Sequence, residues 1–200
     1  MTAPTGTRTA TRARTTRETD IEVTVDLDGT GETDVQTGVG FFDHLLTSLG
    51  HHALMDLRIR ATGDLHIDEH HTVEDVALVL GDAISGALGD RAGISRFGDA
   101  RVPMDDALAS VALDLSGRPY AVLDLAFVGE RIGDMATQNV EHVLGSLART
   151  LGANLHVTAS GRNDHHIAEA AFKALGRSLR AAVALDPRRT GVASTKGSLG

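Results

Sequence analysis

A short histidine motif occurs twice in this chain, and the repetition limits the folds that the chain can adopt. The motif is an acidic residue, two histidines and a glutamate three positions later: EHHTVE at residues 69–74 and DHHIAE at residues 164–169. A second pattern, an acidic residue followed by histidine, precedes each copy, as DH at residues 43–44 and EH at residues 141–142. Two patterns repeated in the same order indicate a duplicated half-domain.

Alternating hydrophobic and polar residues predict two strands in each half. Residues 57–63 and 155–161 align with one another and both end in glycine. Residues 21–27 and 111–115 form a second matching pair, and an Asp-Gly or Ser-Gly turn signal follows each of them. Because a period of two places every second side chain on one face of a sheet, these strands are predicted to be half-buried.

The segments after the motifs predict helices. Hydrophobic residues form a stripe at helical spacing over residues 73–84, and again over residues 167–179. Residues 45–49 and 143–147, which follow the upstream histidines, form a second matching pair of helical stretches. We therefore expect an α+β fold of two duplicated half-domains, each a mostly antiparallel sheet packed on two helices. The expected organisation is a disordered leader at residues 1–13, half-domains at residues 14–93 and 94–187, and a C-terminal tail at residues 188–200.

Composition excludes several classes of function. With 19 basic and 27 acidic residues, the net charge of −8 argues against nucleic-acid binding, and 3% aromatic residues leave little for base stacking. No hydrophobic run is long enough to span a membrane, so no membrane partner is expected. The 200 residues contain no cysteine, which excludes disulfides and thiolate ligands and fits a cytoplasmic location.

The spacing within the motif suits metal binding. On a helix, residues four apart lie on one face, so His70 can share an ion with Glu74, and His165 with Glu169. The second histidine of each pair lies about 100° further around the helix and is not expected to bind the same ion. Pseudo-twofold symmetry then predicts two ions with four ligands each: His70, Glu74, His142 and His166 for one, and His165, Glu169, His44 and His71 for the other.

Imidazole and carboxylate ligands without thiolate favour Mn, Fe or Zn. Four ligands leave positions open on a six-coordinate ion, so substrate can bind there directly. A single His-His pair is more often a helix cap or a surface feature than a ligand pair, and the duplication is what favours metal. Of the other histidines, His52 lies near the site in sequence and is expected to contact substrate, whereas His66 and His156 are expected to be ordinary strand residues.

The chain also resembles the imidazoleglycerol-phosphate dehydratase family of histidine biosynthesis. The resemblance rests first on GFFDHLL at residues 40–46, GDLHIDEHHTVED at 63–75 and HHIAEAAFK at 165–173. It covers nearly the whole chain from about residue 14 onward. Shorter matching segments are RET at 17–19, LDGTG at 27–31, SRFGD at 95–99, DLSGRPY at 114–120 and STKG at 194–197.

This resemblance implies a fold and an activity. The fold would be two half-domains of the ribosomal protein S5 domain 2-like type, assembled as a homo-oligomer of 24 subunits with active sites between subunits. The activity would be that of a hydro-lyase that dehydrates imidazole glycerol phosphate to imidazole acetol phosphate in L-histidine biosynthesis. Two Mn²⁺ ions per active site would act as Lewis acids on the substrate's ring nitrogens, forming and stabilising an imidazolate.

The resemblance also implies roles for individual residues. The eight predicted ligands fall on the family's metal-binding positions. Glu18 matches a carboxylate that contacts substrate and is the leading candidate for proton transfer, with Glu169 as the second candidate. The predicted substrate-binding residues, several of which suit a phosphate, are Glu18, His52, Arg96, Arg118, Lys173, Ser194, Thr195 and Lys196.

Two other functions fit the ligand pattern. A non-catalytic metal-storage or scaffold shell would use the same ligands but give no role to Glu18, Arg96, Arg118 and Lys196. A metal-dependent phosphohydrolase would release inorganic phosphate instead of forming a ketone. Measuring ketone formation with and without a chelator distinguishes these hypotheses.

Overall fold

Both halves of the chain form a four-stranded sheet of the same topology. In the computed structural model, which describes residues 7–199, the first sheet has the order β1-β2-β4-β3 and the second the order β5-β6-β10-β7. In each half the third strand is parallel to its neighbour, and the other pairs are antiparallel. The strands are β1 (Thr9–Thr15), β2 (Thr19–Asp26), β3 (Thr33–Gln36), β4 (Asp56–Gly63), β5 (Phe97–Met104), β6 (Ala107–Asp114), β7 (Tyr120–Leu125) and β10 (Asn154–Ser160).

The register of the central strands explains the alternating sequence pattern. In the first sheet Val23 lies opposite Ile59, and both side chains are fully buried. In the second sheet Val111 lies opposite Val157, and both are almost fully buried. The hydrophobic set of each strand therefore faces the helices, which confirms the predicted half-buried strands.

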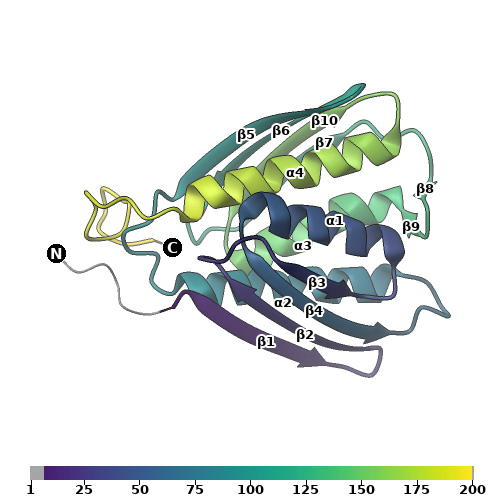
Figure 1. Cartoon of the computed structure of the whole chain (residues 1–200), viewed down its shortest axis with the longest axis horizontal. Coiled ribbons are helices and arrows are strands. Elements are labelled where there is room, and N and C mark those ends of the chain that lie inside the picture. The colour runs from purple at the N-terminus through teal and green to yellow at the C-terminus, as the bar shows by residue number, and fades with distance from the viewer. Residues whose placement is uncertain (1–6, 200) are drawn as a thin grey trace.

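Four helices lie between the two sheets, so that the molecule has two outer sheet layers and helices in the middle (Figure 1). They are α1 (Gly40–Ala53), α2 (His70–Leu88), α3 (Thr137–Leu151) and α4 (Asp164–Val183). Each helix of the first half packs against one of the second half, α1 on α4 and α2 on α3. This arrangement confirms the predicted α+β fold of two duplicated half-domains.

Equivalent glycines allow the helices of the two halves to approach closely. A Cβ atom on Gly81 of α2 would lie 2.7 Å from the carbonyl oxygen of Leu147 on α3. A Cβ atom on Gly176 of α4 would likewise lie 2.7 Å from the carbonyl oxygen of Leu49 on α1. Both glycines follow the first histidine of their motif by 11 residues, so the duplication preserved the packing contact together with the motif.

The prediction of a disordered leader at residues 1–13 was wrong for residues 9–13, which belong to a strand. Residues 9–15 form β1, which pairs antiparallel with β2; residues 1–6 lie outside the described residues. Its arginines pair with acids of α2: Arg12 Nε lies 3.1 Å from Asp82, and Arg14 Nε lies 3.1 Å from Asp75. The segment is polar because it is an edge strand, and its alternating threonines suit an exposed pleated surface.

The molecule has two distinct ends along the helix axes. All four helices begin next to the small hairpin β8 (Arg131–Ile132) and β9 (Met135–Ala136), at the right of Figure 1. We call this the helix-start end. The C-terminal tail lies at the opposite end, where Ala92 and Val192 form an isolated β-bridge. We call this the tail end.

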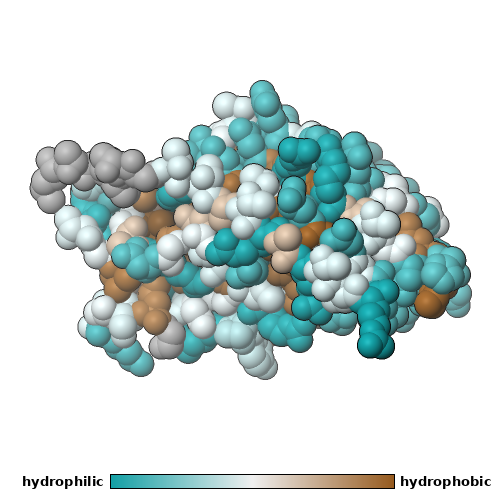
Figure 2. Space-filling model, turned by 90° about the horizontal axis from the view of Figure 1, so that it is seen from below, coloured by the Kyte–Doolittle hydropathy of each residue, from teal (hydrophilic) through white to brown (hydrophobic). Residues whose placement is uncertain are grey.

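The side of the molecule seen in Figure 2 carries hydrophobic residues in scattered groups among hydrophilic ones. Within residues 7–199, none of the helices combines the length and the hydrophobicity that a membrane span requires.

Candidate metal centre

Three predicted ligands of the first half-site come together at the helix-start end. His70 and Glu74 lie one helical turn apart on α2, and His142 faces them from α3. The Nε2 atoms of His70 and His142 lie 3.7 Å and 3.3 Å from the same oxygen, Oε2 of Glu74. The two imidazole rings stack with their centroids 4.7 Å apart. We call these residues the first triad.

The second half-site repeats this geometry on the other two helices. His165 and Glu169 lie on α4, and His44 faces them from α1. Nε2 of His165 and Nε2 of His44 lie 3.2 Å and 3.1 Å from Oε2 of Glu169. In each triad one ligand atom per residue lies within 4.8 Å of the other two. We call this set the second triad; the two triads together contain six of the eight predicted ligands.

Within one chain, His71 and His166 lie apart from the triads to which the sequence spacing assigned them. The prediction placed His71 with His165 and His166 with His70, but within one chain each stays beside its own sequence neighbour, at ring-centroid distances of 5.9 Å and 6.1 Å. The reason is that both lie on the same helices as these neighbours and point to a different side. The four-ligand sets are therefore not formed within a single chain.

Carboxylates orient these two histidines. Nδ1 of His71 lies 3.0 Å from Asp64, and Nδ1 of His166 lies 2.7 Å from Asp106. The hydrogen bond to Asp64 raises the pKa of His71, and the bond to His166 holds the pKa of Asp106 well below its ordinary value. A carboxylate on Nδ1 leaves Nε2 as the atom available for a metal ion. Sequence reasoning missed both aspartates, because neither belongs to the repeated motif.

The donor atoms of the triads fit a divalent metal ion. Nε2 of His142 is buried and has no hydrogen-bond partner among the described residues, although Glu74 lies beside it. An ion held between these groups would satisfy that nitrogen. Imidazole nitrogens with one carboxylate oxygen are the ligands that Mn, Fe and Zn accept. The residues present therefore fit the metal that the ligand pattern predicts.

Glu169 of the second triad is held as an anion. Burial raises the pKa of this carboxyl group, but hydrogen bonds from Lys173 and His44 outweigh it and lower the pKa to about 2. Nζ of Lys173 lies 2.8 Å from Oε1 of Glu169. His52, on the last turn of α1, lies on the same side: burial, His51 and the Lys173 charge lower its pKa. Of the predicted substrate residues, Lys173 thus contacts the second triad, whereas His52 lies two turns beyond His44 on α1, next to Gly176 of α4.

Glu18 lies on the turn between β1 and β2, next to His71. Its carboxylate is 3.8 Å from Nδ1 of His71, on the side where Asp64 also lies. Its side chain is half exposed. Within one chain Glu18 is therefore grouped with His71 and not with either triad.

The predicted phosphate-binding residues lie at the tail end. Arg96 donates through Nε and Nη2 to Asp114, at 2.6 Å and 2.9 Å, and through Nη1 to the carbonyl oxygen of Ala193 at 2.7 Å. This contact places Ser194, Thr195 and Lys196 directly after the residue that Arg96 holds. Arg118 is exposed on the turn that follows β6. Sequence reasoning gave no role to Asp114, the partner of Arg96.

The tail end and the triads are far apart within one chain. The backbone N–H of Arg96 donates to the carbonyl oxygen of Ala182, near the end of α4. His165 lies near the start of that helix, 17 residues earlier. At 1.5 Å per residue the separation is about 25 Å. One small substrate cannot reach both sets of residues in the same chain.

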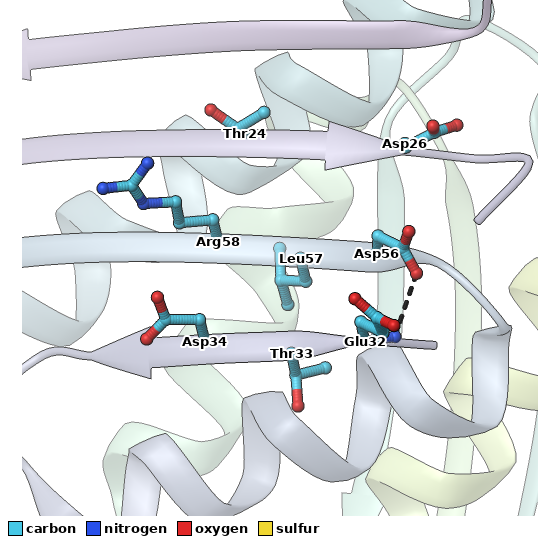
Figure 3. A pocket seen from close by; sticks show the side chains of 8 residues that line it. All are labelled: Thr24, Asp26, Glu32, Thr33, Asp34, Asp56, Leu57 and Arg58. Atoms are coloured by element: carbon cyan, nitrogen blue, oxygen red, sulfur yellow. Dashed lines mark hydrogen bonds between the residues drawn. The ribbon is translucent and has the colours of Figure 1, made fainter. Parts of the chain in front are cut away.

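A groove on the first sheet gathers other carboxylates without forming a comparable site (Figure 3). Oδ1 of Asp56 accepts the backbone N–H groups of Thr30, Gly31 and Glu32, so it fixes the loop before β3. Asp34 pairs with Arg60. These acids already have partners within the fold, and none of the residues that line the groove is a histidine.

A comparison with protein families identifies the chain. The family model described as imidazoleglycerol-phosphate dehydratase matches residues 37–179. This chain belongs to the imidazoleglycerol-phosphate dehydratase family. A relative from Acidiphilium cryptum with this name is 58% identical over 194 residues, covering 96% of this chain and 99% of its own. A second, from Dinoroseobacter shibae, is 56% identical and covers 96% and 100%.

Solved structures agree with this assignment. The imidazoleglycerol-phosphate dehydratase of Staphylococcus aureus is 31% identical and superposes with a TM-score of 0.81, covering 89% of this chain and 99% of that one. The enzyme of Pyrococcus furiosus, solved in complex with (S)-C348, is 40% identical with a TM-score of 0.81, covering 94% and 100%. The chain is thus a lyase that acts on a small substrate and catalyses the dehydration step of histidine biosynthesis.

Proposed function

We propose that this imidazoleglycerol-phosphate dehydratase converts imidazole glycerol phosphate to imidazole acetol phosphate with two divalent metal ions, Mn²⁺ in our prediction, in each active site. The observation that carries the proposal is the pair of equivalent triads. Each offers two imidazole nitrogens and one carboxylate oxygen within 4.8 Å of one another. The substrate ring has two nitrogens, and two like sites suit its two edges.

The first triad would hold one ion and the second triad the other, with His166 and His71 of neighbouring subunits completing the two sets. When bound, the ions would act as Lewis acids on the ring nitrogens and stabilise the imidazolate form of the substrate. The other contributions come from side chains of this protein.

Glu18 is proposed to transfer the proton. Dehydration removes the hydroxyl from the carbon bonded to the ring and a hydrogen from the next carbon of the chain, and the resulting enol becomes a ketone with water as the second product. Because Glu18 lies beside His71, it would accompany His71 into the active site of a neighbour. Glu169, whose pKa is lowered to about 2, would remain a carboxylate ligand and is a poor proton donor. The role of Glu169 as a metal ligand therefore favours Glu18 for the proton transfer.

Arg96, Arg118 and the Ser194–Lys196 segment are proposed to bind the phosphate group. A guanidinium suits a phosphate because it donates two parallel hydrogen bonds. Asp114 already fixes the plane of the Arg96 guanidinium, and Arg96 holds the tail at Ala193. Lys173, beside the second triad, and His52, further along α1, are proposed to contact the remainder of the substrate.

We infer an assembly of several subunits from the placement of these groups. The phosphate-binding residues lie about 25 Å from the triads of the same chain, estimated from the rise of α4. His71 and His166 are also separated from the triads that they are proposed to complete. Both facts support active sites between subunits, and we propose the 24-subunit homo-oligomer. A cytoplasmic location also stays our prediction, which cell fractionation would test.

Turnover of the metal-replete and the chelated protein tests the metal requirement. We expect ketone formation that chelation abolishes and Mn²⁺ restores, without release of inorganic phosphate. Lys196→Ala should raise the KM for substrate and leave the bound Mn²⁺ unchanged. Ketone formation that chelation leaves intact would contradict the two-metal proposal, and phosphate release would favour a phosphohydrolase.

A further inference from the structure

The first acidic residue of each motif belongs to neither triad, yet both copies bind one segment. Oε1 of Glu69 accepts the backbone N–H of Ala136 at 2.6 Å. The carboxylate of Asp164 accepts the backbone N–H groups of Val128 and Gly129 at 3.1 Å and 2.6 Å. We call residues 128–136, which include the β8–β9 hairpin, the strap. The leading acids of both motifs therefore anchor the strap at its two ends.

The strap also contacts the other two helices. The carboxylate of Asp134 accepts the backbone N–H groups of Gly40 and Phe41, at 2.6 Å and 3.0 Å, where α1 begins. α3 starts at Thr137, directly after the strap. One segment thus connects the first turns of all four helices that carry triad residues.

Within the described part of the chain, only the first copy of the motif extends this contact to a triad residue. Asn139, on the first turn of α3, donates through Nδ2 to Oε1 of Glu69 at 3.3 Å. Oδ1 of Asn139 lies 3.1 Å from Nδ1 of His70. Asn139 and Glu69 are both buried, with 3% and 7% of their surface exposed. A continuous polar chain therefore connects the strap with the first triad.

The chemistry of this chain fixes the state of His70. A carboxylate only accepts hydrogen bonds, so the NH₂ group of Asn139 must face Glu69 and its carbonyl oxygen must face His70. Nδ1 of His70 then carries the proton and donates it to that oxygen. Nε2 is left with its lone pair toward Glu74, which is the tautomer that a metal ligand requires.

In the residues that the structure describes, the second triad has no equivalent of this polar chain. Among residues 7–199, no group hydrogen-bonds Nδ1 of His165, and Asp164 uses its carboxylate on the strap alone. Among the described residues, the side-chain oxygen of Asn163 accepts only the backbone N–H of His165, as the N-cap of α4. Two asparagines thus lie near the motif histidines, but only one reaches an imidazole ring.

We propose that Glu69 and Asn139 are positioning residues that fix the tautomer and orientation of His70 in the first triad. This inference rests on the proposed function, in which His70 is a metal ligand. Neither residue is placed against substrate or metal; they act through His70. Loss of such a partner typically weakens metal binding about 10- to 100-fold.

Titration of the metal-free protein with Mn²⁺, following the EPR signal of the free ion, tests the proposal. Wild-type protein should bind two ions per chain. Asn139→Ala should weaken one of the two sites by about 10- to 100-fold and leave the other unchanged. Asn163→Ala, the matched control, removes a helix cap without touching a ring and should keep both affinities. Wild-type affinities at both sites of Asn139→Ala would overturn the proposal.

A double-mutant cycle separates positioning from a general loss of structure. In a His70→Asn background the ligand is already absent, so Asn139→Ala should cause no further loss at either site. An additional loss equal to that seen in the wild-type background would overturn the proposal. If the alanine variant does not fold, Asn139→Leu fills the same volume without the hydrogen bonds and should weaken the same site.

The failure of the proposed function would look different. Wild-type protein that binds no Mn²⁺ would refute the metal proposal before any variant is compared. Wild-type protein that binds two ions, together with an unaffected Asn139→Leu variant, would refute only the role of Glu69 and Asn139.

Discussion

The glutamate of the first triad is more exposed than that of the second, and the cation beside it is further away. The Glu74 side chain is 27% exposed and that of Glu169 is 11% exposed. Nη2 of Arg149 lies 3.6 Å from Glu74, whereas Nζ of Lys173 lies 2.8 Å from Glu169. The cations also come from different places, since Lys173 lies on the same helix as its glutamate and Arg149 on the facing one.

The features that the triads share are those that ligand geometry requires. The histidine and glutamate are four residues apart in both, the third ligand comes from the facing helix, and Gly81 and Gly176 allow the same close helix approach. After duplication, changes in the surrounding charges were tolerated because they leave the ligand positions unaltered. The ligand scaffold and its electrostatic surroundings can therefore diverge independently.

His71 and His166 also share a feature that the two halves supply from different positions in the fold. Each has a carboxylate on Nδ1, but Asp64 directly follows β4 whereas Asp106 precedes β6. These positions are not equivalent in the two halves. A carboxylate partner was thus retained, or acquired, from two different strand ends.

The largest effect is expected from replacing the histidine that each triad receives from the facing helix. His44→Asn and His142→Asn should each lower kcat/KM about 10³-fold or more, because a Lewis-acidic ion contributes several kcal/mol and each 1.4 kcal/mol is about tenfold. Steady-state ketone formation measures this, with His156→Asn on the exposed face of β10 as the matched control. If only one of the two variants loses activity, the triads are not equivalent in the reaction.

The next effect tests whether the two histidines outside the triads act between subunits. His71→Asn and His166→Asn should each reduce activity more than about 100-fold and also lower the assembled mass, measured by light scattering after size exclusion. His66→Asn, an exposed histidine in the same region, should change neither. Full activity with full assembled mass in both variants would contradict active sites between subunits.

A smaller effect should distinguish Lys173 from Arg149, the cations beside the two triad glutamates. Lys173→Met should raise the KM for substrate about tenfold or more, because it removes a charged hydrogen bond in a partly buried place. Arg149→Met should change KM less than about fivefold, since exposed ion pairs contribute at most about 1 kcal/mol. Steady-state kinetics of both variants test this. Equal effects would show that the different exposure of the two glutamates has no consequence for binding.

The smallest effect concerns the acid stability of the metal-free protein. The pKa of Glu169 is lowered to about 2 in the folded state, so its contribution to stability is present above its ordinary pKa of 4.5 and is lost as the pH falls toward 2. Urea unfolding of Glu169→Gln should therefore show a shallower loss of stability over this range than the wild type. Glu22→Gln, on the exposed face of β2, is the control and should follow the wild type.

Much of the fold could be predicted from local patterns. The alternation at residues 21–27 and 155–161 predicted strands because a strand has a period of two, and the helices followed from their hydrophobic stripes. The pairing of His70 with Glu74 also followed from helix geometry alone. The edge strands β1, β3, β5 and β7 were missed because an edge strand buries few side chains, so its sequence has little hydrophobic periodicity.

The sequence by itself determined the duplication, the two sheets and the ligands that share a helix face, because these depend on periodicity within a few residues. Only the tertiary structure decided that Asn139 meets His70, that Asp114 holds Arg96, and that His71 stays away from the second triad. Such contacts join residues distant in sequence, or depend on which way a helix face points. The packing of the whole chain sets these contacts, and no local sequence pattern encodes that packing.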